Sequence, residues 1–124
     1  MLIDFASKKL EDMANGEEDG AYSKLAKHIK NKSPVTIEDV VSAIDVLAAA
    51  PSCGDIPARY NPHPLDGKLK GSFAVDILTG RGGRGKYRVI FRSNHGSDDP
   101  EFRIDNYKSI RKIVIEGICV DYHK

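Results

Sequence analysis

Apolar and polar positions follow two different periods along this chain, helical in the first half and strand-like in the second. Apolar residues recur three or four positions apart within 7–14, 21–29 and 40–48, a spacing that predicts amphipathic helices. Thr36 stands just before the third of these segments, as an N-cap residue would, and Pro51 ends it. The first half is therefore predicted to be helical and dominated by a helical hairpin.

The second half alternates apolar and polar residues in the manner of strands. Strands are predicted over 72–78, 87–92 and 113–124, with a further short strand at 2–5. Helices followed by an antiparallel meander predict an α+β fold, with N-terminal helices packed on a twisted antiparallel sheet. We expect residues 1–124 to form a single domain.

Composition excludes several classes of protein but does not indicate an activity. The chain has 124 residues and a formal net charge of +1, enough for one hydrophobic core but too neutral for a general nucleic-acid coat. No apolar run approaches the roughly 20 residues that cross a membrane, and the start lacks a signal-peptide pattern, so we expect a cytoplasmic protein with no membrane partner. Cys53 and Cys119 belong to no CxxC pair, so reduced thiols are expected and neither a metal nor a cofactor is predicted.

Positive charge is concentrated between Lys68 and Arg92, where Asp76 is the single acidic residue. Such a region suits a polyanion bound at one place, although two solvated hairpin faces would give the same pattern. Within it, residues 80–86 read Gly-Arg-Gly-Gly-Arg-Gly-Lys, close to a phosphate-binding P-loop. The residue that follows is Tyr87 and no helix is predicted there, so a nucleotide site is rejected. A hairpin turn is predicted instead, with Arg81 and Arg84 near a backbone phosphate.

His63 is the histidine with the most informative surroundings. It lies between Pro62 and Pro64, which restrict the backbone, and Lys68 and Lys70 follow closely. Histidine titrates near neutral pH, so a histidine whose backbone is restricted and that lies beside lysines suits acid–base chemistry on a phosphate. A histidine in a loop is, however, more often structural. His28 and His95 have no comparable setting.

Three motifs occur together in this order along the chain. They are His63-Pro64-Leu65-x-Gly67 with a following Lys-Gly, the strand Tyr87-Arg88-Val89-Ile90-Phe91-Arg92, and the terminal Val120-Asp121-Tyr122-His123. This combination resembles the RelE/HigB superfamily of toxins from bacterial toxin–antitoxin systems, most closely the HigB (plasmid-killer) branch. The resemblance spans most of the chain.

The resemblance implies an endoribonuclease that cleaves messenger RNA on the ribosome, without a metal, and so inhibits translation. It implies that mRNA and ribosomal RNA are partners, together with a cognate antitoxin that carries a helix-turn-helix domain. Carried over by position, His63, Asp121, Tyr122 and His123 form the catalytic cluster, and Arg88 holds the scissile phosphate.

These residue types suit cleavage by attack of the 2′-hydroxyl, which needs one proton removed, another donated and negative charge stabilised on phosphorus. His123 or Asp121 would be the base and His63 the acid, or the reverse, with Tyr122 orienting the hydroxyl or stacking on a base. Lys68 or Lys70 would assist Arg88. The alternative is a catalytically weak protein of the same fold that acts through an antitoxin or another protein partner, and a third is an unrelated α+β domain.

Overall fold

The computed structural model describes residues 1–16, 36–67, 71–78, 84–94 and 107–120, without the side chains at 84–86, 107, 119 and 120. The helix predicted at 21–29 lies outside these ranges.

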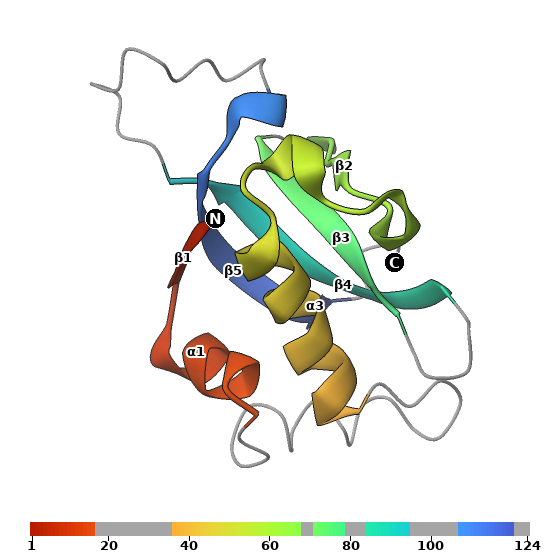
Figure 1. Ribbon diagram of the computed structural model, residues 1–124. Helices are drawn as coiled ribbons and strands as arrows, with labels where there is room; N and C mark the ends of the chain where they lie inside the picture. Colours follow the sequence, from red (N-terminus) through yellow and green to blue (C-terminus); the bar gives the residue numbers. More distant parts are fainter. Residues whose placement is uncertain (17–35, 68–70, 79–83, 95–106, 121–124) are drawn as a thin grey trace.

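Within the described ranges the chain forms one mixed five-stranded sheet in the order β1-β5-β4-β3-β2 (Figure 1). The strands are β1 (Leu2–Phe5), β2 (His63–Pro64), β3 (Ser72–Leu78), β4 (Arg84–Ser93) and β5 (Lys112–Val120). Strands β3 to β5 form the predicted antiparallel meander, and β2, in a stretch that was predicted to be a loop, pairs antiparallel with β3. The α+β class is therefore confirmed.

The prediction of a wholly antiparallel sheet is wrong, because β1 runs parallel to β5 with Leu2 opposite Lys112. A parallel neighbour needs a crossover rather than a hairpin. Almost the whole chain separates β1 from β5, so their relative direction is set by the path of the intervening elements and not by a turn.

Two helices are described, α1 (Lys8–Ala14) and α3 (Ile37–Ala49). Thr36 caps α3 as predicted: its hydroxyl accepts from the backbone N–H of Asp39 at 3.1 Å, and the Asp39 carboxylate accepts from the Thr36 N–H at 3.0 Å. Together these bonds form a capping box. No helix in the described ranges is long and apolar enough to cross a membrane.

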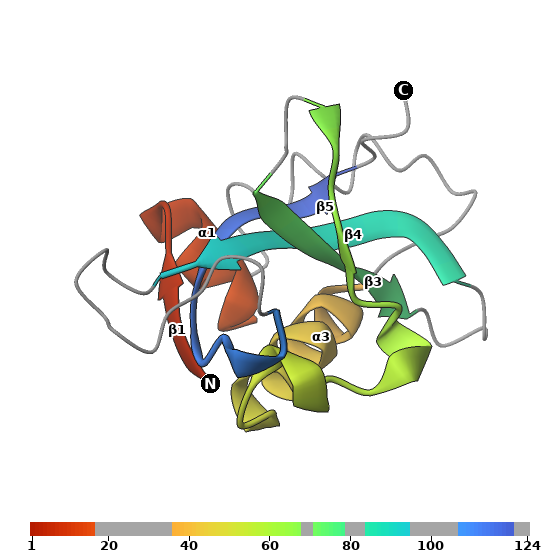
Figure 2. The same cartoon turned by 90° about the horizontal axis from the view of Figure 1, so that it is seen from above.

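The main core lies between α3 and one face of the sheet, and Figure 2 shows α3 on that side of the sheet from above. Alternation along β3 and β4 explains it, because Val75, Ile77, Val89 and Phe91 all point to the helical side and are almost fully buried. Leu47 of α3, also fully buried, belongs to the same cluster. This core fixes which residues of β3 and β4 face the other way.

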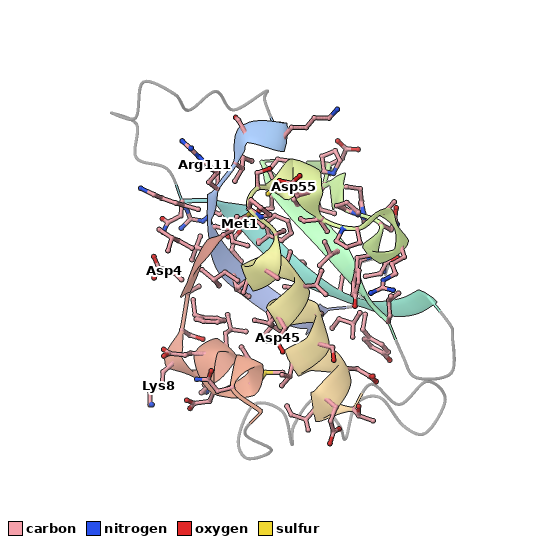
Figure 3. The ribbon with its side chains drawn as sticks, viewed as in Figure 1. Met1, Asp4, Lys8, Asp45, Asp55 and Arg111 are labelled. Atoms are coloured by element: carbon pink, nitrogen blue, oxygen red, sulfur yellow. The ribbon has the colours of Figure 1, made fainter. Side chains whose placement is uncertain are left out.

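The N-terminus ties β1 to the end of α3. The amino group of Met1 donates to the carbonyls of Ala48 and Ala50 at 2.8 and 2.5 Å, groups that a helix end leaves without intrahelical partners. Figure 3 labels Met1 beside this helix end. Cys53 is buried here, with its Sγ 3.7 Å from the Met1 sulfur. Its burial fits the predicted reduced thiol, and the side chain of Cys119 is outside the described set.

The boundaries of the strands refine the predictions. β3 spans the predicted 72–78, whereas β4 begins at Arg84 rather than at Tyr87. The turn predicted over 80–86 is therefore wrong at its C-terminal end, since Arg84, Gly85 and Lys86 belong to the strand. Described β5 ends at Val120, so the predicted continuation to residue 124 is not tested.

Candidate functional site

The sheet face turned away from α3 carries two clusters of polar side chains. We call it the polar face and define it by Asn61, His63, Ser72, Ala74, Asp76, Arg88, Ile90, Arg92 and Glu116. In the β3–β4 register Asp76 lies opposite Arg88, Ala74 opposite Ile90 and Ser72 opposite Arg92. Paired residues share a face, so these three pairs form successive rows across the sheet.

The first row centres on a buried ion pair. Nε of Arg88 lies 3.0 Å from Oδ1 of Asp76, and their side chains are 13% and 2% exposed. The two atoms do not have hydrogen-bond geometry, so the contact is a charge pair. A carboxylate removed from water requires a nearby cation or several donors, and among the described residues Arg88 is a cation beside it.

Asn61 extends the same row on the β2 side. Its side-chain amide donates to Oδ2 of Asp76 at 3.4 Å, a long bond. Asn61 has φ 50° and ψ 54°, a left-handed conformation that asparagine tolerates better than most residues. It follows the short 3₁₀ helix Ala58–Tyr60 and precedes Pro62. This turn brings the amide to Asp76 and leads the chain into β2.

His63 lies in the second row, opposite Ala74. Its Nδ1 is 2.7 Å from the carbonyl oxygen of Asn61. Because a carbonyl can only accept, Nδ1 must carry the proton and donate it. Nε2 is then the nitrogen of this half-buried ring that carries the lone pair in the neutral form.

The positions of His63 and Arg88 follow from the register. They flank β3 on the same face, two strands apart and offset by two residues along the strands. With strands about 4.8 Å apart and a rise of about 3.3 Å per residue, their Cα atoms are about 12 Å apart. A phosphate-sized group between them would be within reach of both side chains.

A second polar cluster occupies the opposite end of the same face. The hydroxyl of buried Ser72 donates to Oε1 of Glu116 at 2.6 Å, and Nε of Arg92 lies 3.5 Å from Oε2 of that carboxylate. Between the two polar clusters Leu65, Ala74 and Ile90 form a small apolar cluster. Both arginines of the face that the structure describes, Arg88 and Arg92, thus lie against a carboxylate.

Of the predicted site residues, His63 and Arg88 are described and lie on one face. Arg84 begins β4, and its side chain is not described. The remaining ones lie outside the described ranges; they are Lys68, Lys70, Arg81, Asp121, Tyr122 and His123. Val120, the residue before Asp121, is opposite Arg88 in the β4–β5 register.

Sequence reasoning missed the roles of Asp76 and Asn61. Asp76 was noted only as the one acid in a basic stretch. Its position between Val75 and Ile77 in an apolar strand is the signal that was available, because an acid in a buried strand predicts a partner on a neighbouring strand. For Asn61 the sequence offers only the Asn-Pro pair, a turn signal.

The helical side of the molecule differs in charge. α3 contains Glu38, Asp39 and Asp45 and no lysine or arginine, and Figure 3 labels Asp45 on this helix. Negative charge disfavours a polyanion there. Across the described residues, no three His, Cys, Asp or Glu side chains gather where they could hold a metal ion.

Comparison with known proteins adds no family to these observations. No protein-family model matches the chain, and no curated protein matches its sequence.

Proposed function

We propose that this protein is a RelE/HigB-like toxin with a RelE-like fold: a cytoplasmic endoribonuclease that cleaves mRNA on the ribosome and inhibits translation. The observation that carries the proposal is the placement of His63 and Arg88 on one sheet face, flanking β3. The two residues come from distant parts of the sequence and supply a proton-transfer group and a cation, which cleavage by the 2′-hydroxyl requires.

In this proposal the scissile phosphate binds between His63 and Arg88. Nε2 of His63 exchanges a proton with the attacking or leaving oxygen, since its Nδ1–H is engaged by Asn61. The guanidinium group has five N–H donors, and a single carboxylate cannot accept from all of them. Arg88 can therefore contact Asp76 and a phosphate together. Asp121, Tyr122 and His123 complete the catalytic cluster, and Lys68, Lys70, Arg81 and Arg84 contact RNA. No metal or cofactor takes part, and a helix-turn-helix antitoxin silences the enzyme.

The test is cleavage of a defined mRNA on purified translating ribosomes, mapped by primer extension. We expect wild-type protein to cut within ribosome-bound codons, and His63→Ala and His123→Ala to lose about 100- to 10,000-fold in rate, the usual worth of a general acid or base. Lys8→Ala is the matched control, because Lys8 is an exposed residue of α1 on another part of the molecule. Intact mRNA with wild-type protein, or full activity in His63→Ala, would refute the proposal.

A second candidate is the catalytically weak binding protein that acts through an antitoxin or another partner. The Asp76–Arg88 pair favours it, because an arginine already neutralised by a buried carboxylate gives less electrostatic stabilisation to a phosphorane. Wild-type and His63→Ala proteins would then be equally inactive on mRNA, while both form a stable complex with a helix-turn-helix protein encoded in the adjacent reading frame.

A further inference from the structure

A continuous series of contacts joins His63 to Arg88 across three strands. Nδ1–H of His63 donates to the Asn61 carbonyl at 2.7 Å, the Asn61 amide donates to Oδ2 of Asp76 at 3.4 Å, and Oδ1 of Asp76 lies 3.0 Å from Nε of Arg88. Each of the two intermediate residues therefore contacts both of its neighbours in the series. Neither was a candidate on sequence grounds.

Asn61 makes its two contacts through different parts of the residue. The backbone carbonyl holds the imidazole, and the side-chain amide holds the carboxylate. Both depend on the left-handed backbone at φ 50°. A non-glycine residue persists in that conformation only where its surroundings compensate the cost, and such residues concentrate at functional sites.

We propose that Asn61 and Asp76 are positioning residues of the nuclease site, an inference that rests on the proposed function. The Asn61 carbonyl selects the Nδ1–H form of His63 and so presents Nε2 to the substrate. Asp76, oriented by the Asn61 amide, sets the angle at which the Arg88 guanidinium meets the phosphate. The two groups that contact one phosphate are thus aligned by a shared residue.

A purely structural role for the same contacts has different consequences. If Asn61 served only to satisfy a buried carboxylate, its loss would lower stability and leave catalysis per folded molecule unchanged. A positioning role lowers kcat with KM little affected, because alignment matters most in the transition state. The tautomer of His63 reports whether the Asn61–His63 contact is present, and kcat separates the two roles.

The variant that separates the two contacts is Asn61→Gly. Glycine adopts the left-handed backbone readily and keeps the carbonyl, so only the amide bond to Asp76 is lost. Asn94→Ala is the matched control: Asn94 also donates its amide to a carboxylate, Oδ2 of Asp4 at 2.8 Å, just beyond the end of β4. Asp76→Asn, nearly the same in shape, removes the charge that faces Arg88.

Two measurements test the proposal. Nitrogen-15 NMR of the imidazole in wild-type protein without RNA should show the Nδ1–H tautomer for neutral His63, and Asn61→Gly should retain it. In ribosomal mRNA cleavage, Asn61→Gly and Asp76→Asn should lower kcat about 10- to 100-fold, the range seen when groups that orient catalytic residues are removed. Asn94→Ala should match wild type.

The outcomes separate this inference from the function on which it rests. If wild-type protein leaves mRNA intact, the proposed function fails, and the NMR result still reports on the Asn61–His63 contact. The positioning role is overturned by an Nε2–H tautomer in folded wild-type protein, a result that needs no variant to fold. It is also overturned if Asn61→Gly, confirmed as folded by its NMR spectrum, keeps the wild-type kcat.

Discussion

Removing one partner of the Asp76–Arg88 pair should destabilise the protein strongly. The Asp76 side chain is 2% exposed and that of Arg88 13%, so both groups are largely withdrawn from water. Asp76→Val leaves the guanidinium in that environment without this counter-charge, and Arg88→Met leaves the carboxylate. Breaking a buried pair from one side costs about 3–5 kcal/mol, so each single variant is predicted to lose stability in that range.

The double variant should lose less than either single one. Replacing both members by apolar side chains removes both desolvation costs, and such replacements are often neutral or stabilising by about 1–4 kcal/mol. Valine suits the strand position of Asp76, and methionine retains most of the Arg88 chain length. The double-mutant cycle should therefore show strong non-additivity, as expected for residues in direct contact.

Urea unfolding followed by circular dichroism provides the measurement, with the free energy obtained by linear extrapolation. The matched control is Lys8→Ala, which breaks the exposed ion pair between Lys8 Nζ and Asp12 Oδ1, 3.6 Å apart. An i,i+4 pair of that kind contributes about 0.3–0.5 kcal/mol. If Asp76→Val and Arg88→Met each cost no more than about 1 kcal/mol, as surface pairs do, the pair is not desolvated and the reasoning fails.

Three further predictions concern the framework and use the same unfolding assay. Gly71 has φ 98° with open space around it, so Gly71→Ala should cost about 1–2 kcal/mol from the backbone alone, and Gly71→Asn less; equal costs would contradict this. Leu47→Ala should cost about 2–5 kcal/mol because Leu47 is fully buried, whereas Leu47→Met should cost under about 1.5 kcal/mol. Thr36→Ala should cost about 1 kcal/mol by removing the cap of α3, and Thr36→Ser should restore it.

Local sequence patterns predicted the helices and strands well where the stabilising contacts join residues that are close in sequence. The strand at 72–78 was correct because Phe73, Val75 and Ile77 alternate and face the core together. The start of α3 was correct because Thr36 and Asp39 cap it through contacts three residues apart. These causes act within one turn or one strand, so they can be read in the sequence.

Features that depend on distant residues were not predicted. The parallel pairing of β1 with β5 joins opposite ends of the chain, and no local signal fixes its direction. The Asp76–Arg88 contact requires the β3–β4 register, which the pattern of neither strand specifies by itself. His63 was singled out by its flanking prolines and following lysines, Arg88 came from the resemblance, and the register is what shows that they share a face.

The charge of the polar face bears on how an RNA would reach it. Arg88 and Arg92 each lie against a carboxylate, and the net charge of the whole chain is +1. Attraction of free RNA depends on unneutralised positive charge and on counterion release from each phosphate that is contacted. A face whose arginines are paired with carboxylates can orient a phosphate that is already bound, but it attracts free RNA from solution only weakly. The proposed nuclease is therefore expected to need its substrate held by another molecule, which agrees with the proposal that it acts on the ribosome.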